Sequence, residues 1–125
     1  MSKKRNILSS FNYAGSGIKE AFKSEPNFRI HIILGILSVI LGIFFKFSLE
    51  KFAILALTIC FVIVLELINT VVEKLVDAVS PSFSPEAKII KDLSAGIVLI
   101  SALSAIAVGL LLYLPSILRL LSVSN

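Results

Sequence analysis

Residues 52–77, FAILALTICFVIVLELINTVVEKLVD, decide the fold, because an apolar run passes directly into a series of acids. The apolar part, 52–65, has 14 residues and would measure about 21 Å as a helix. A membrane span needs about 30 Å. A span that begins here must therefore include Glu66 and Asn69 near one end, while Glu73 and Asp77 emerge toward the headgroups.

The polar residues of this stretch share one helix face. At about 100° per residue, positions 66, 69, 73 and 77 fall within an arc of about 80°. Glu73 and Asp77 also fit an ordinary solvated helix end. Glu66 does not, since it lies between two leucines and an ionised carboxylate in hydrocarbon costs about 2.5–3.5 kcal/mol. An acid at that depth predicts a functional site.

The composition is that of a membrane protein. The chain has 125 residues, of which 57% are hydrophobic and 16% charged, too apolar for a soluble domain of this size. The net charge of +4 comes largely from the N-terminal part, which favours anionic headgroups. No nucleic-acid-binding module is present. The single cysteine, Cys60, excludes a disulfide framework and a cysteine metal cluster within one chain.

The hydropathy pattern predicts an all-α, integral membrane domain over residues 1–125. An amphipathic helix at about 6–24 precedes three spans at about 28–47, 50–72 with an extension to 79, and 92–118. The first helix fits either the membrane interface or packing on the spans. The basic N-terminal segment lacks a long apolar core and a cleavage pattern, so we expect it to be retained. Short connections predict an antiparallel bundle.

Basic residues predict the orientation of the spans. Six precede or begin the first span, and Lys74, Lys88 and Lys91 lie between the second and third. Both regions should therefore be cytoplasmic. Glu25, the acids of 66–77 and Asp92 then lie at one membrane face, where a soluble metabolite meets a lipid.

The loop before the third span carries helix-start signals. In SPSFSP, 80–85, Ser84 is a suitable N-cap and Pro85 a suitable first-turn residue. Lys88 and Lys91 follow, where they either hold phosphates near the helix start or serve as ordinary flanking charges. Gly96, with Ala95 and Ser94, predicts a close approach between helices.

Three motifs resemble those of prokaryotic diacylglycerol kinases: EPNFRIH at 25–31, ExxNTxxExxVD at 66–77 and AKxxKDxxAGxVL at 87–99. The likeness covers nearly the entire chain, and NFRIH is similar to the branch that includes undecaprenol kinases. The resemblance implies a small integral-membrane lipid kinase. It also implies a homotrimer that uses ATP and Mg²⁺, with sites completed between subunits.

The resemblance further implies a role for each site residue. Glu66 would be the base on the lipid hydroxyl, and Glu25 and Glu73 would hold Mg²⁺. Asn69 would orient Glu66 or nucleotide groups, and Lys91 would neutralise phosphate charge. The remaining nucleotide-binding residues would be Asp92 and, on a surface helix that covers the nucleotide, Tyr13 and Gly17. For Tyr13 and Gly17 the alternative is packing or anchoring at the membrane interface. Ser84 stands where many relatives have histidine, and bulkier residues replace small ones at Ile89, Ile90 and Ile97.

The sequence therefore predicts an ATP- and Mg²⁺-dependent kinase of a membrane lipid alcohol at the cytoplasmic face of a bacterial inner membrane. Undecaprenol is the first expected acceptor and diacylglycerol the second. Phosphoryl transfer mainly needs a positioned nucleotide, metal and base, and the acid and lysine motifs supply these residue types. The competing hypothesis is a non-enzymatic scaffold or ion-conducting helix bundle whose acids line a polar path.

Overall fold

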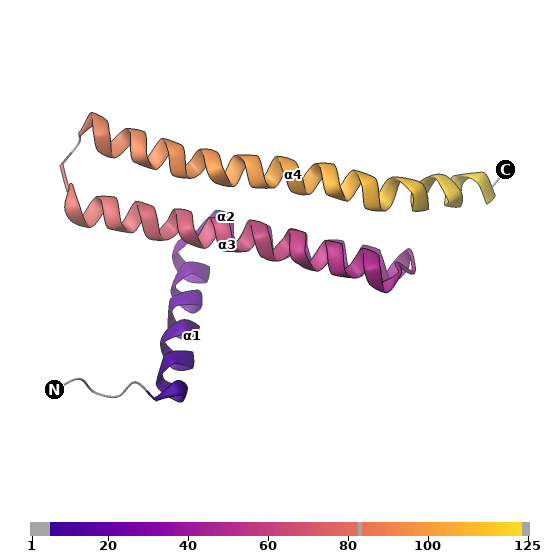
Figure 1. Cartoon of the computed structure of the whole chain (residues 1–125), viewed down its shortest axis with the longest axis horizontal. Helices are drawn as coiled ribbons and strands as arrows, with labels where there is room; N and C mark the ends of the chain where they lie inside the picture. The colour runs from indigo at the N-terminus through magenta and orange to yellow at the C-terminus, as the bar shows by residue number, and fades with distance from the viewer. Residues whose placement is uncertain (1–5, 83, 124–125) are drawn as a thin grey trace.

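The structure is a computed structural model that describes residues 6–82 and 84–123, and within them the chain forms four helices and no strand. Three of these helices are long and apolar enough to span a membrane, which confirms the predicted fold class. They lie alongside one another, whereas the N-terminal helix projects away from them (Figure 1). The helices are α1 (Ile7–Ser24), α2 (Pro26–Phe44), α3 (Leu49–Val79) and α4 (Pro85–Val123).

The corner between α1 and α2 is formed by a proline and an arginine. Glu25 is extended, and Pro26 begins α2, where its missing N–H is not needed. The Arg29 guanidinium donates hydrogen bonds to the carbonyl oxygens of Phe22, at 3.1 Å, and Lys23, at 3.0 Å. These carbonyls belong to the last turn of α1, which has no following turn to bond them. Arg29 thus holds the end of α1 against the start of α2.

The turn between α2 and α3 is packed with aromatic residues. Lys46 adopts a positive φ of 52°, and Ser48 caps α3 by accepting a hydrogen bond from the Lys51 N–H. Phe47 is buried together with Leu55 and Leu112, which ties α3 and α4 to this turn. We call this region the aromatic end.

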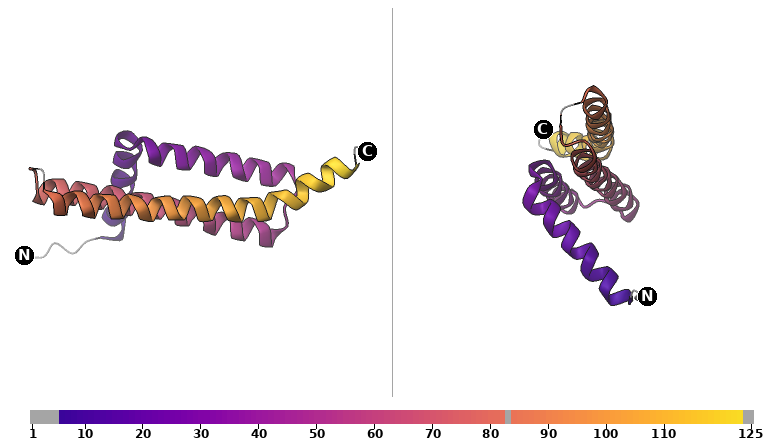
Figure 2. Two further views of the ribbon diagram at one scale, coloured as in Figure 1. Left: turned by 90° about the horizontal axis from the view of Figure 1, so that it is seen from above. Right: turned by 90° about the vertical axis from the view of Figure 1, so that its left-hand side faces the viewer.

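Both long helices exceed the thickness of a membrane. At 31 and 39 residues, α3 and α4 measure about 46 and 58 Å. The extra length of α3 places Glu73 and Asp77 beyond the hydrocarbon region of a membrane. As predicted, Ser84 caps α4, since its hydroxyl oxygen accepts a hydrogen bond from the Ala87 N–H at 3.0 Å. The helix continues through Pro115 and bends in its C-terminal part (Figure 2).

Small residues set the contacts within the bundle, although not all of them are the predicted ones. Ser94 and Ser101 of α4 are buried, and α3 is the principal packing partner of α4. A Cβ atom at Gly96 would meet no atom within 4 Å, so the predicted close approach does not involve Gly96 within one chain. Gly35 of α2 does make such a contact, because a Cβ there would lie 2.9 Å from Ile59 Cγ2.

Candidate functional site

The acid-bearing face of α3 runs from the interior of the protein to solvent. Glu66 is only 2% exposed and Asn69 8%. Glu73, one turn further on, is half-buried, and the Asp77 side chain is 67% exposed. The single helix face predicted from the spacing therefore becomes a gradient from a buried carboxylate to a solvated one.

Two oxygens on the buried part of this face have no hydrogen-bond partner in the described part of the chain. The Asn69 amide nitrogen donates to Glu73 Oε1 at 3.0 Å. Asn69 Oδ1 and Glu66 Oε2 are buried and accept no hydrogen bond from any residue in the described ranges, 6–82 and 84–123. Leaving a buried polar atom unpaired costs about 1–3 kcal/mol. Two such atoms on successive turns of one helix indicate a place for a ligand.

Glu25, between α1 and α2, and His31 of α2 lie near Glu66 together with Glu73 of α3. The charges of Glu25 and Glu73 both act on the Glu66 carboxyl group, and so does that of His31. Glu25 itself is half-buried and accepts a hydrogen bond from the Ser24 hydroxyl at 2.8 Å. Glu25 and Glu73, to which the resemblance gives the metal, thus lie within electrostatic range of Glu66, although the three carboxyl groups do not converge on one point among the described residues.

These acids fit a magnesium ion that is shared with a phosphate. Within residues 6–82 and 84–123, no three His, Cys, Asp or Glu side chains converge to hold a metal by themselves. Mg²⁺ is commonly bound by one or two carboxylates together with waters and substrate phosphates. A donor set of Glu25 and Glu73 matches that pattern.

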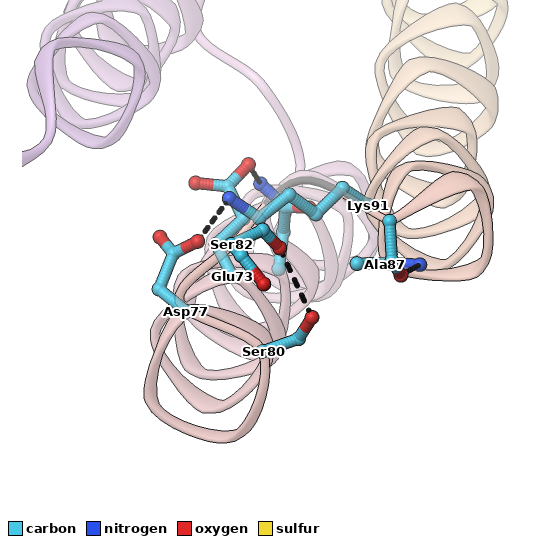
Figure 3. Close-up of polar contacts among 8 residues, drawn as sticks. Glu73, Asp77, Ser80, Ser82, Ala87 and Lys91 are labelled. Atoms are coloured by element: carbon cyan, nitrogen blue, oxygen red, sulfur yellow. Dashed lines mark hydrogen bonds and ion pairs between the residues drawn. The ribbon is translucent and has the colours of Figure 1, made fainter.

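The predicted nucleotide residues of α4 both form ion pairs. Lys91 Nζ lies 2.5 Å from Asp77 Oδ1 and bridges α4 to α3 (Figure 3). Lys88 Nζ lies 2.6 Å from Asp92 Oδ2, one turn apart on α4. The Asp77–Lys91 pair thus places a cation beside the acid-bearing face.

The structure does not bring Tyr13 and Gly17 to the acids within one chain. Tyr13 is 70% exposed, and a Cβ atom at Gly17 would meet no atom within 4 Å. Both lie on α1, about 18 and 12 Å along the helix from Glu25. A contact of Tyr13 or Gly17 with a nucleotide therefore stays a prediction, which needs the nucleotide or a second subunit to lie against α1.

An apolar cavity of about 500 Å³ lies between α2, α3 and α4. His31 and Val62 line one end, and Val62 is one helical turn from Glu66. The lining continues to Leu41 and Tyr113 near the aromatic end. The cavity therefore leads from the level of Glu66 into the membrane-spanning part of the bundle.

Sequence reasoning placed Asp77 on the acid face but assigned no contact to it. The signal for the Asp77–Lys91 pair was the polar loop at 80–84, because residues that flank a short turn between antiparallel helices face each other. Asp77 ends the motif at 66–77, but the resemblance gave a role in the site only to Lys91 of this pair.

Comparison with known proteins finds relatives that match most of this chain. Residues 12–113 match the sequence model of the family described as prokaryotic diacylglycerol kinase. A diacylglycerol kinase of Synechocystis is 43% identical over 117 residues, which cover 93% of this chain and 67% of the relative. An undecaprenol kinase of Bacillus subtilis is 36% identical over 89% of this chain and 90% of its own length. A diacylglycerol kinase of Helicobacter pylori is 30% identical over 77% of this chain and 75% of the relative.

Proposed function

This chain belongs to the prokaryotic diacylglycerol kinase family and is a lipid kinase, and from that premise we propose that it transfers the γ-phosphoryl group of ATP to a membrane lipid alcohol. The observation that carries the proposal is Glu66, a buried carboxyl group with an unpaired oxygen in a membrane-spanning helix. An acid is costly in an apolar segment, so its presence there indicates a functional role.

Glu66 acts as the general base on the lipid hydroxyl. Its unpaired Oε2 is an acceptor for that hydroxyl proton, and its position in α3 suits a lipid whose polar end lies at the membrane surface. Removing this proton as the oxygen attacks phosphorus is the contribution of a base in phosphoryl transfer. Asn69 holds Glu73 by a hydrogen bond and presents its own free oxygen beside Glu66.

Glu25 and Glu73 hold Mg²⁺. The ion would neutralise charge on the nucleotide phosphates when it is bound. The two carboxylates come from different elements, the α1–α2 corner and α3, and both act electrostatically on Glu66. Binding the metal between them would therefore also relieve the mutual repulsion of the three acids.

The nucleotide lies over the ends of α3 and α4. Lys91 offers a cation for its phosphates, and Asp92 supports its binding from the same helix. Tyr13 and Gly17 cover the nucleotide from α1. We propose that the functional unit is a homotrimer, in which a neighbouring subunit completes the site, and that the N-terminus is cytoplasmic.

The proposed acceptors are undecaprenol first and diacylglycerol second. The relatives divide between these two names, and the NFRIH motif at 27–31 supports the first. The cavity between α2, α3 and α4 supports a hydrocarbon tail beneath a hydroxyl at Glu66, because its lining is almost entirely apolar.

The test is transfer of labelled γ-phosphate from ATP by the purified protein in mixed micelles, with undecaprenol and diacylglycerol offered separately. We expect a labelled lipid that requires Mg²⁺ and disappears in Glu66→Gln. The matched control is Glu86→Gln, which removes an exposed carboxylate from the first turn of α4. A correctly assembled protein that labels neither lipid would overturn the proposed acceptors and favour a scaffold or an ion-conducting bundle.

A further inference from the structure

Lys91 is bound to an acid in this structure, although the proposed function requires it for phosphate. Its ammonium lies 2.5 Å from Asp77 Oδ1, and the two side chains are 37% and 67% exposed. Figure 3 shows the Lys91 side chain extended from α4 toward α3, where it meets Asp77. The contact joins residues 14 positions apart and so depends on the packing of the two helices.

The Asp77–Lys91 contact lies where the nucleotide is proposed to bind. Asp77 lies one turn beyond Glu73 on the face that begins with Glu66, so the pair holds the lysine ammonium at the solvent side of the proposed magnesium ligands. Lysine has four flexible methylenes and a cation that binds as a point charge. Among the described contacts, Asp77 is the group of α3 that binds this ammonium.

The pair is also weak enough to exchange. Ion pairs between exposed side chains are screened by water and contribute little. A nucleotide polyphosphate carries several negative charges, whereas Asp77 carries one. A phosphate that enters beside Lys91 therefore competes successfully for the ammonium, and the displaced Asp77 carboxylate is left solvated.

We propose that Asp77 is a competing anion that occupies the Lys91 ammonium beside the acid-bearing face in the nucleotide-free protein and releases it to a phosphate of the incoming nucleotide. This inference rests on the proposed function, because it takes Lys91 as the phosphate-binding cation. Asp77 is then a competitor of the nucleotide, and its removal strengthens nucleotide binding through Lys91.

The experiment is a double-mutant cycle on the full chain in micelles, in which binding of a non-hydrolysable ATP analogue with Mg²⁺ is measured by titration calorimetry. In Asp77→Asn we expect the dissociation constant to fall about two- to fivefold, the range of an exposed ion pair. In the Lys91→Gln background the same Asp77 substitution should change nothing. Asp77→Glu, which keeps the carboxylate, should bind as the unaltered protein does, and so should Glu86→Gln.

Each other outcome overturns the inference. An equal gain in both backgrounds means that Asp77 merely repels the nucleotide, and weaker binding in Asp77→Asn means that the pair is structural. If Lys91→Gln alone leaves nucleotide binding unchanged, the phosphate role of Lys91 fails and the inference fails with it. Transfer of label to lipid by the unaltered protein separates that result from failure of the kinase proposal itself.

Discussion

The two ends of the α3–α4 pair differ in whether their polar groups are hydrogen-bonded. At the aromatic end, the Tyr113 hydroxyl donates to the Ser38 carbonyl at 2.5 Å, and Lys51 Nζ donates to the Leu112 carbonyl at 3.2 Å. Lys51 also lies 4.8 Å from the centre of the Phe47 ring. At the acid-bearing end, Glu66 and Asn69 each keep a buried oxygen without a partner in the described chain. The aromatic end therefore pairs these polar groups between helices, whereas the acid-bearing end, although the Asp77–Lys91 pair joins its helices, keeps two buried acceptors unpaired among the described residues.

The largest expected effect comes from Glu66→Gln, at the acid-bearing end. The amide keeps the shape of the side chain but cannot take up the lipid hydroxyl proton. We expect kcat for lipid phosphorylation to fall about 10²- to 10⁴-fold, the usual contribution of a general base. Initial rates in mixed micelles at saturating ATP and lipid measure this change.

The same substitution should leave the fold and nucleotide binding largely intact. Replacing a buried, unpaired carboxyl group with a neutral amide removes no hydrogen bond from Glu66 Oε2. Near-normal kcat in Glu66→Gln would remove the base assignment, whereas loss of nucleotide binding would reassign Glu66 to the nucleotide site.

The next effect is expected at the aromatic end, from Phe47→Ala. Phe47 packs against Phe52 and Tyr113 and belongs to the buried cluster with Leu55 and Leu112. Its truncation should lower the free energy of unfolding by about 3 kcal/mol, because it leaves a cavity where the helices meet. Titration with a denaturing detergent, followed by circular dichroism, measures the loss.

Phe61→Ala is the matched control, since Phe61 lies on α3 and is exposed at the bundle surface. Its effect on stability should be much smaller than that of Phe47→Ala. The kcat of folded Phe47→Ala protein should stay near normal. Equal destabilisation by the two substitutions would contradict the assigned role of the aromatic end.

A smaller effect is expected from Glu73→Gln, which tests a second carboxylate of the acid-bearing end. The amide oxygen still accepts the Asn69 hydrogen bond, so the change removes mainly the charge offered to Mg²⁺. We expect magnesium-dependent nucleotide binding to weaken about tenfold, equivalent to about 1.4 kcal/mol. Calorimetric titration of the ATP analogue over a range of Mg²⁺ concentrations measures it. An unchanged dependence on Mg²⁺ would exclude Glu73 as a ligand.

The fold could be predicted because a membrane leaves few choices. Each span needs about 20 apolar residues with satisfied backbone groups, so hydropathy alone locates the long helices. The shared face of the acids could be predicted from the turn of about 100° per residue in a helix. The N-cap at Ser84 could be predicted because serine commonly caps helices. These features depend on local sequence.

The contacts between helices could not be predicted in the same way. Whether Gly96 or Ser94 faces α3 depends on the rotation of α4 about its axis, which packing determines. The bonds from Arg29 to the end of α1 depend on the angle between α1 and α2. The partnership of Lys91 with Asp77 likewise follows from the register of two helices and not from either motif.

The smallest effect is expected from Tyr113→Phe, which removes one hydroxyl from the aromatic end and keeps the ring. Loss of its hydrogen bond to the Ser38 carbonyl should lower the free energy of unfolding by about 0.6 kcal/mol, the average for such bonds between membrane helices. Ser38→Ala is the control, because the acceptor is the backbone carbonyl and survives the change. A loss in Ser38→Ala equal to that in Tyr113→Phe would place the effect in packing and not in the bond. Lipid phosphorylation should be unchanged in both variants, since Tyr113 lies about 33 Å along α4 from Lys91, and a fall in kcat would show that the two ends are coupled.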